Sequence, residues 1–148
     1  MIVTTLNNKN KKHVDAVKKL AEQSLITVDL SELTTQCVLI ALTPQDKILG
    51  FLSYKEDYNC DYIPATPANN IFVTSVEAEL LENKTDILSD FYQYLQDLYP
   101  SHEIYVKALS SDTANVRILT EKGFVFHTVV ENRNREDIDV VCFKYDPI

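Results

Sequence analysis

Apolar residues recur at helical spacing in three segments of the chain. Residues 11–24 form an amphipathic pattern with a basic outer face. Residues 110–123 form another, with Ser111 as the predicted N-cap and Gly123 as the predicted end. Residues 25–33 are compatible with a short helix or a turn. The clearest helix is predicted at residues 86–99, before Pro100, and its apolar face carries Ile87, Leu88, Phe91, Leu95 and Leu98.

Strand patterns fill the segments between these helices. In residues 124–128, Phe124 and Phe126 alternate with Val125 and His127, so that His127 points to the other face of the sheet if both phenylalanines face the core. Pro and Asp in residues 43–47 predict a hairpin between two strands. The other predicted strands are residues 1–5, 36–42, 48–54, 70–76, 103–109 and 139–145.

The order of these elements, β–α–(α)–β–β–β–α–β–α–β–β, indicates the fold class. A single strand between two helices requires a crossover connection, so part of the sheet is expected to be parallel. The hairpin and the last two strands are expected to be antiparallel. The sequence therefore predicts one α/β (α+β) domain, residues 1–148, with a mixed, mostly antiparallel sheet of about seven strands and helices on both faces.

Composition and charge narrow the possible functions. The chain has 148 residues and a formal net charge of −8, which argues against a nucleic-acid-binding surface. No apolar run reaches the roughly 20 residues that span a membrane, and the N-terminal pattern is unlike a signal peptide. The three cysteines lack metal-ligand spacing, and Cys37 and Cys142 are expected to be buried in strands. We therefore expect a cytoplasmic protein without a metal site.

Residues 110–126, SSDTANVRILTEKGFVF, resemble the C-terminal motif of the GNAT-type N-acetyltransferase superfamily. Gly123 and Phe124 match the motif directly. Asp112 stands where the family usually has Asn, and Asn115 stands at its small residue. Leu119 stands where a Tyr often protonates the departing CoA thiolate. The order of elements is also similar to the GNAT fold along nearly the whole chain, which implies a central parallel pair of strands and transfer of an acetyl group from acetyl-CoA to an amine.

The second family signature is the turn after the central strand, where backbone N–H groups hold the pyrophosphate of CoA. The matching residues, 76–86, read VEAELLENKTD, contain no glycine and place Leu81 at the family's arginine. They bring four carboxylates to this turn, those of Glu77, Glu79, Glu82 and Asp86. Asn83 or Thr85 could equally be a plain helix cap. The resemblance implies an acetyl-CoA site formed by Thr74, Val76, Asn83, Lys84, Thr85, Asp86, Asp112 and Asn115.

Direct attack of an amine on a thioester needs a base, an oxyanion donor and an acid. The candidate bases are Glu77, which follows the central strand, and His127, because histidine can change charge near neutral pH. A solvated carboxylate and a surface histidine are the alternatives for these two residues. The oxyanion donor would be a backbone N–H near Val76. Leu119 cannot supply the acid, which leaves water.

The acceptor amine is expected near the loop that follows the hairpin. Asp57, Tyr58 and Asp61 form an acidic, aromatic patch there. Such a patch could bind a cationic amine of a small molecule or peptide through its carboxylates and a cation–π contact. The alternative is a solvated loop without a ligand.

Three possibilities remain open from the sequence. The first is an acetyl-CoA-dependent N-acetyltransferase, and the second is a catalytically inactive GNAT-like binding or regulatory module. The third is an unrelated α+β domain. A GNAT-like fold requires the strands at residues 70–76 and 103–109 to be parallel neighbours that splay apart at one end. The resemblance also implies a possible homodimer through an exposed last strand.

Overall fold

The computed structural model describes residues 1–24, 26, 28–33, 35–58, 60–63, 69–79, 83–131 and 139–147. These residues form seven strands and four helices in the predicted order. The elements are β1 (Ile2–Thr5), α1 (Lys11–Glu22), α2 (Leu30–Leu33), β2 (Cys37–Leu42), β3 (Ile48–Glu56), β4 (Asn70–Ala78), α3 (Lys84–Leu98), β5 (Glu103–Leu109), α4 (Thr113–Glu121), β6 (Val125–Glu131) and β7 (Val140–Tyr145). No helix in these ranges is both long and apolar enough to cross a membrane.

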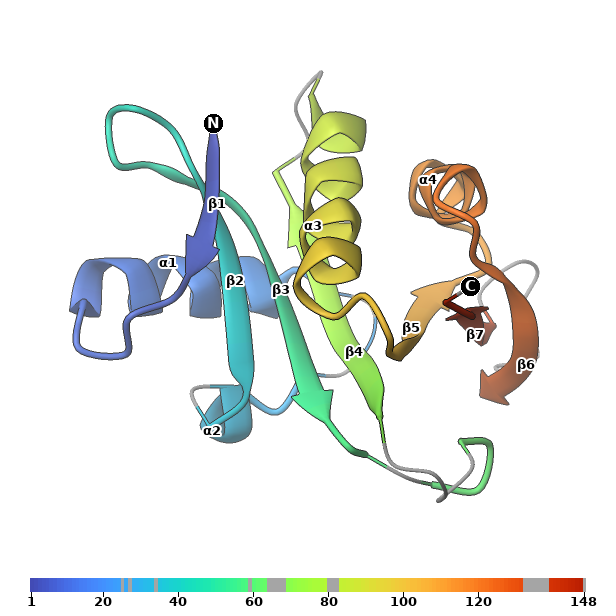
Figure 1. Ribbon diagram of the computed structural model, residues 1–148. Coiled ribbons are helices and arrows are strands. Elements are labelled where there is room, and N and C mark those ends of the chain that lie inside the picture. Colours follow the sequence, from blue (N-terminus) through green and yellow to red (C-terminus); the bar gives the residue numbers. More distant parts are fainter. Residues whose placement is uncertain are drawn as a thin grey trace.

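All seven strands lie in one sheet, in the order β1-β2-β3-β4-β5-β7-β6 (Figure 1). Neighbouring strands are antiparallel except for β4 and β5, which are parallel. The predicted hairpin, the antiparallel last pair and the central parallel pair are therefore confirmed. The prediction of an exposed last strand is wrong, because β7 lies between β5 and β6 and leaves β6 at the edge.

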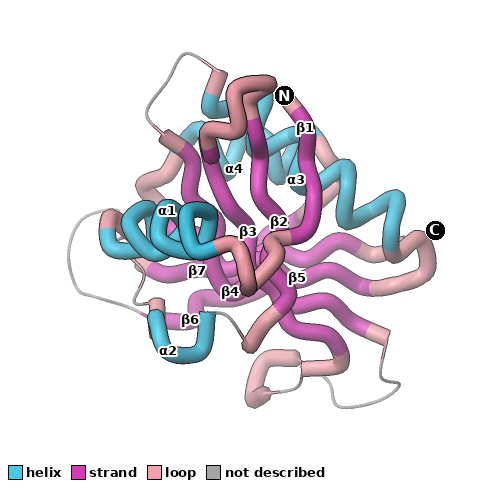
Figure 2. Tube along the Cα trace, turned by 90° about the vertical axis from the view of Figure 1, so that its left-hand side faces the viewer, coloured by secondary structure: helices cyan, strands magenta, loops and turns pink. Residues whose placement is uncertain are grey.

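Helices cover both faces of the sheet, as predicted (Figure 2). On one face, α3 and α4 pack through a core that includes Phe91 and Leu119. On the other face, α1 and α2 pack through a core that includes Val17 and Leu33. Neighbouring residues of β3 contribute to opposite cores, because successive side chains of a strand point to opposite faces.

The parallel pair separates at the carboxyl ends of its strands. Residues 70–73 of β4 pair with residues 103–106 of β5, and the pairing stops there. Both strands nevertheless continue, β4 to Ala78 and β5 to Leu109, and Figure 1 shows β5 turning away from β4. The two strands therefore splay apart, as a GNAT-like fold requires.

A β-bulge marks the start of this separation. Ser53 of β3 lies opposite Ser75, whereas the next residue, Tyr54, lies opposite Val73, so Thr74 is an extra residue in β4. A bulge bends its strand and increases the local twist. The bulge therefore directs the last residues of β4 away from the line of β5.

The ends of α4 differ in how well the sequence predicts them. Gly123 has a φ of 89°, which confirms the predicted end of the helix. The predicted cap, Ser111, is wrong by one residue. The N-cap is Asp112, whose side chain accepts a hydrogen bond from the Asn115 N–H at 3.2 Å.

The structure decides two questions of burial. Phe124 is 2% exposed, but Phe126, in the edge strand β6, is 57% exposed, so the two do not share a buried face. Cys142 is buried as expected, whereas Cys37 begins β2 and is exposed, so its predicted burial is wrong. A strand pattern predicts burial poorly in an edge strand and at a strand end.

Candidate active site

A small cavity lies where β4 and β5 separate, and we call it the slot. Its volume is about 20 Å³, and both strands, the segment after α1 and the start of α4 contribute to its lining. The predicted cofactor residue Val76 is part of this lining. So are Ser24, Ser75, Glu77, Lys107, Asp112 and Asn115.

Glu77 is the one predicted base that the structure brings to the slot. It belongs to β4 and is half-buried. Burial raises the pKa of its carboxyl group above the ordinary 4.5; the Ser24 hydroxyl and then Lys84 oppose this shift, and Asp112 adds to it. The strand β3 comes so close that a Cβ on Gly50 would lie 2.8 Å from the Glu77 carbonyl oxygen. Glu77 is thus a half-buried carboxyl group beside the slot, and burial raises its pKa.

An ion pair joins the beginnings of α3 and α4 beside Glu77. Lys84 Nζ lies 3.9 Å from Asp112 Oδ1, and both side chains are partly exposed. An ion pair of this kind contributes about 0–1 kcal/mol to stability. Lys84 therefore interacts with two carboxylates, those of Asp112 and Glu77, and these already neutralise part of its charge.

The first turn of α3 lacks a side-chain cap. Asn83 is its N-cap but makes no capping hydrogen bond, and the buried Asn83 Oδ1 has no hydrogen-bond partner within the described part of the chain. The first N–H groups of a helix need acceptors, and an anion can supply them. Thr85 and Asp86 lie in this first turn, where the half-exposed Thr85 hydroxyl adds a donor and the exposed Asp86 adds a negative charge.

Two other predicted cofactor residues are engaged within the protein. The Thr74 hydroxyl donates to Gln36 Oε1 at 2.6 Å and lies 2.8 Å from Ser53 Oγ. The side chain of Asn115 is buried, and its Oδ1 accepts a hydrogen bond from the Tyr92 hydroxyl. Thr74 thus ties β4 to β2 and β3, whereas Asn115 ties α4 to α3. Their roles toward a cofactor stay predictions.

The second predicted base, His127, lies elsewhere on the sheet. It is in β6, where its ring packs edge-on against Tyr105 at 5.4 Å and its Nε2 lies 2.8 Å from the Tyr62 carbonyl oxygen. It is absent from the lining of the slot. The geometry therefore favours Glu77 over His127.

The three predicted acceptor residues do not all border one cavity. The Tyr58 ring stacks on Phe72 at 4.9 Å, and Lys55 Nζ lies 5.0 Å from the centre of the same ring. The protein's own lysine therefore makes the cation–π contact that was expected for the substrate. Asp57 and Asp61 are exposed, and neither lines the slot or the cavity beside Tyr58.

Tyr58 instead lines a second cavity next to the slot, of about 180 Å³. The two share Ser75 and Lys107, so they meet at the splayed strands. The lining of this second cavity includes Asp29, Glu32, Lys55, Tyr58, Ser75 and Lys107.

Lys107 is the residue that sequence reasoning missed. It lies in β5 between buried residues, and burial lowers the pKa of its ammonium group below the ordinary 10.5. Glu131 opposes this shift and Lys55 adds to it. The available signal was a single cation inside an otherwise apolar strand, EIYVKAL, because buried charged side chains are rare without a function or a partner.

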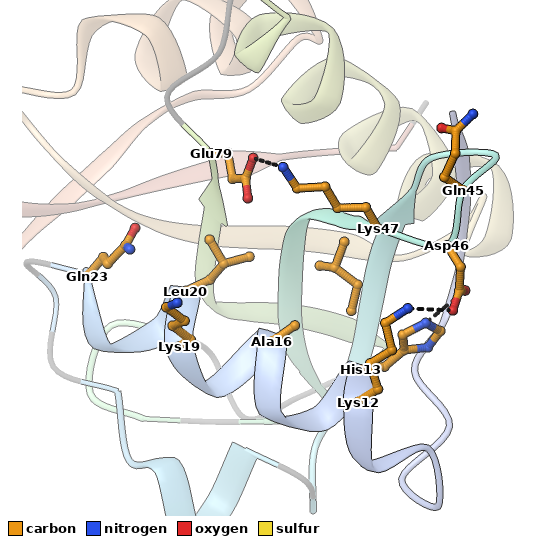
Figure 3. Close-up of a pocket in the computed structure, with 11 residues that line it drawn as sticks. Lys12, His13, Ala16, Lys19, Leu20, Gln23, Gln45, Asp46, Lys47 and Glu79 are labelled. Atoms are coloured by element: carbon orange, nitrogen blue, oxygen red, sulfur yellow. Dashed lines mark hydrogen bonds and ion pairs between the residues drawn. The ribbon is translucent and has the colours of Figure 1, made fainter.

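A larger groove of about 740 Å³ lies away from the splayed strands, between α1 and the β2–β3 turn (Figure 3). Part of its charged rim is paired within the protein: Lys47 Nζ lies 3.4 Å from Glu79 Oε2, and Asp46 contacts both Lys12 and His13. Neither Glu77 nor Lys107 lines this groove. The slot therefore stays the candidate site, although the groove is larger.

The described residues contain no cluster of three or more side chains able to hold a metal ion. Residues 80–82 of the predicted pyrophosphate turn, with Leu81 and Glu82, lie outside the described ranges. So does most of the connection between β6 and β7.

No protein-family model and no curated protein sequence matches the chain significantly. Solved structures do match. An aminoglycoside 6′-N-acetyltransferase from Enterococcus faecium has a TM-score of 0.71 at 16% identity, over 98% of this chain and 96% of that one. An aminoglycoside 6′-N-acetyltransferase in complex with coenzyme A gives 0.72 at 15% identity, over 97% and 96% of the two chains.

A third similar structure has a different substrate in its name. It is a ribosomal-protein-alanine N-acetyltransferase from Brucella melitensis, with a TM-score of 0.67 at 12% identity over 99% of both chains. At such identities the likeness establishes the fold alone. The possibility of an unrelated α+β domain is wrong, and the chain has the GNAT-type N-acetyltransferase fold.

Proposed function

We propose that the protein is an acetyl-CoA-dependent N-acetyltransferase that acts on an amine. The observation that carries this proposal is the slot itself, in which the splayed ends of β4 and β5 lie beside the half-buried Glu77. Strands that stay paired along their whole length would leave no gap between them at this point.

Glu77 is the proposed base. Burial raises the pKa of its carboxyl group, which makes the carboxylate a stronger base toward an ammonium group than an exposed glutamate would be. The backbone N–H near Val76 is the proposed oxyanion donor, since β4 has left its pairing with β5 at this point. Leu119 is fully buried and cannot donate a proton, so the sulfur leaving group takes its proton from water.

Acetyl-CoA would supply a thioester whose C–S bond breaks as the bond from the acetyl carbon to the amine nitrogen forms. The residues present at the start of α3 fit its pyrophosphate in two respects: the first turn has no side-chain cap, and Lys84 lies beside it. Thr85 adds a hydroxyl donor. The amide of Asn83 can turn its Nδ2 toward an anion, because the two ends of an amide group exchange by a rotation.

One observation favours the alternative function, a GNAT-like module without catalysis. Asp112 holds Lys84 in an ion pair, and Asp86 adds a further carboxylate to the same helix start. These charges repel a pyrophosphate, whose binding must first break the pair. If acetyl-CoA does not bind, the acidic surface beside the slot would be the interaction face of such a module.

Calorimetric titration with acetyl-CoA and with CoA tests the proposal. We expect micromolar dissociation constants for the wild-type protein and a loss of about tenfold or more for Lys84→Glu, because the variant places a carboxylate where a phosphate should lie. Lys11→Glu is the matched control, since it makes the same charge change at an exposed position of α1.

The outcomes separate the two functions. Binding that is weakened by Lys84→Glu and unchanged by Lys11→Glu supports the enzyme and leads to a screen of amines. An absence of binding at millimolar acetyl-CoA contradicts the enzyme and leads to the search for a protein partner.

We propose that the interface of the possible homodimer is formed by β6 and not by the last strand, β7. This edge strand exposes Val125, Phe126 and Val129 by 60%, 57% and 48%. An apolar, unpaired edge is suited to pairing with a second copy. Light scattering checks this: we expect a dimer for the wild-type protein and a monomer for Phe126→Lys.

A further inference from the structure

The second cavity separates two kinds of charge. Its lysines come from the strands, Lys55 from β3 and Lys107 from β5, whereas its carboxylates come from the other side, Asp29 before α2 and Glu32 within it. A ligand in this cavity therefore meets cations on the sheet and carboxylates on the helix. This arrangement suits a molecule that carries both signs of charge.

The carboxylate of Asp29 is already engaged. Its Oδ1 accepts hydrogen bonds from the Ser31 N–H at 2.9 Å and the Ser31 hydroxyl at 2.6 Å. Lys55 is held over the Tyr58 ring, but an ammonium group in a cation–π contact still has donors for an anion. Among these charged groups, Lys107 is the one whose pKa is shifted mainly by burial.

A bound anion would stabilise the charged form of Lys107 more than that of an exposed lysine. It is half-buried, Lys55 repels it, and the carboxylate of Glu131 favours its charged form. A buried cation costs free energy unless an anion accompanies it. A carboxylate or similar group in the second cavity would reduce that cost.

Lys107 also borders the slot, together with Ser75. An anion bound at Lys107 therefore lies near the place where the acceptor amine must meet the thioester. The volume of about 180 Å³ is below the ~300 Å³ at which sites for drug-sized ligands begin, which favours a small acceptor.

We propose that the acceptor is a small amine that also carries a carboxylate a few bonds from its nitrogen, as in a free α-amino acid, and that Lys107, assisted by Lys55, binds this carboxylate. The inference rests on the proposed acetyltransferase function. Lys107 then determines acceptor specificity, while Glu77 takes the amine proton. A purely cationic polyamine is a poor acceptor, since both lysines repel it.

The experiment compares common α-amino acids with their primary amides as acceptors, in an assay that measures release of the CoA thiol. The quantity of interest is the ratio of kcat/KM for an acid to kcat/KM for its amide. The intrinsic reactivities of the two amines differ, but this difference cancels when the ratio is compared between variants. We expect the ratio to fall by about tenfold or more in Lys107→Gln, because a charge-assisted contact is lost.

Matched variants guard against loss of the fold. Lys107→Arg is expected to keep most of the ratio, and Lys55→Gln to lower it less than Lys107→Gln does. Lys11→Gln, on the outer side of α1, is expected to leave it unchanged. Binding of acetyl-CoA by every variant, measured separately, shows that the protein is folded.

The possible failures are distinguishable. If acetyl-CoA does not bind, the proposed function fails and this inference falls with it. If acetyl-CoA binds and amines are acetylated but the ratio is the same in Lys107→Gln, the inference is overturned and the proposed function stands. If acetyl-CoA binds and no amino acid is acetylated, the inference is likewise overturned.

Discussion

Glu77 and Lys107 are two half-buried charges on neighbouring strands, and they border the same slot. Burial pushes each of them toward its neutral form, by raising the pKa of the carboxyl group and lowering that of the ammonium group. Their electrostatic neighbours differ. Glu77 responds to Lys84 and Asp112, whereas Lys107 responds to Glu131 and Lys55.

The splay between the strands therefore separates two local electrostatic environments. Two opposite charges that paired fully would each have stabilised the charged form of the other. Here the largest influence on both is burial, which costs stability and is typical of sites where a group must lose or gain a proton or bind a charged ligand. We therefore expect substitutions at the two residues to separate chemistry from acceptor binding.

The largest expected effect is on turnover in Glu77→Gln. Removal of a general base reduces kcat by about 10²- to 10⁴-fold, while the fold and acetyl-CoA binding should be retained. The measurement is kcat with a saturating acceptor, over a range of pH. Glu79→Gln is the control, two residues along the chain and in an ion pair with Lys47 outside the slot. Equal losses in both variants would contradict the assignment of Glu77 as the base.

A smaller effect is expected on cofactor affinity in Asp112→Asn. The substitution removes the carboxylate that neutralises Lys84 but keeps the N-cap of α4, because Asn caps a helix as well as Asp does. We expect CoA to bind about two- to fivefold more tightly, in line with the ~0.3–1 kcal/mol that a charge contributes at a helix start. Calorimetry measures this, and weaker binding of CoA would show that Asp112 itself contributes to the site.

The fold could be predicted from the sequence because its information is local. The apolar stripe of α3, the glycine that ends α4 and the apolar strands each identify an element without reference to the rest of the chain. The failures occur where a neighbour decides the outcome. The N-cap is Asp112 and not Ser111, because Asp112 reaches the Asn115 N–H, and Phe126 is exposed in the edge strand β6.

The site could be predicted only in part, for a related reason. Glu77 could be named as a candidate because it follows the predicted central strand directly in sequence. The position of Lys107 beside the slot depends on the order β4-β5-β7 and on burial by other strands, which a lysine inside an apolar segment does not reveal. Likewise, only the packing of Lys55 on Tyr58 reveals that the expected cation–π contact is already made within the protein.

A further prediction concerns stability at neutral pH. Lys107→Met replaces a half-buried ammonium group by an apolar side chain of similar length, so we expect the free energy of unfolding to rise by about 0.5–2 kcal/mol. Urea denaturation at pH 7 measures this change. Lys11→Met, at an exposed position, should change stability by less than about 0.5 kcal/mol. A destabilised Lys107→Met would mean that the lysine is well paired in the folded protein.

The smallest effects are pH-dependent, and they run in opposite directions for the two residues. Lys107 has a lowered pKa in the folded protein, so between that pKa and 10.5 the unfolded chain binds more protons and stability rises with pH. The stability advantage of Lys107→Met should therefore shrink as the pH rises toward 10.5. Glu77 has a raised pKa, so between 4.5 and that pKa the folded chain binds more protons and stability falls with rising pH. An advantage of Glu77→Gln at pH 7 should therefore disappear as the pH falls below 4.5. Denaturation series over pH measure the difference in free energy of unfolding between each variant and the wild-type protein. We expect this difference to shrink at high pH for Lys107→Met and at low pH for Glu77→Gln.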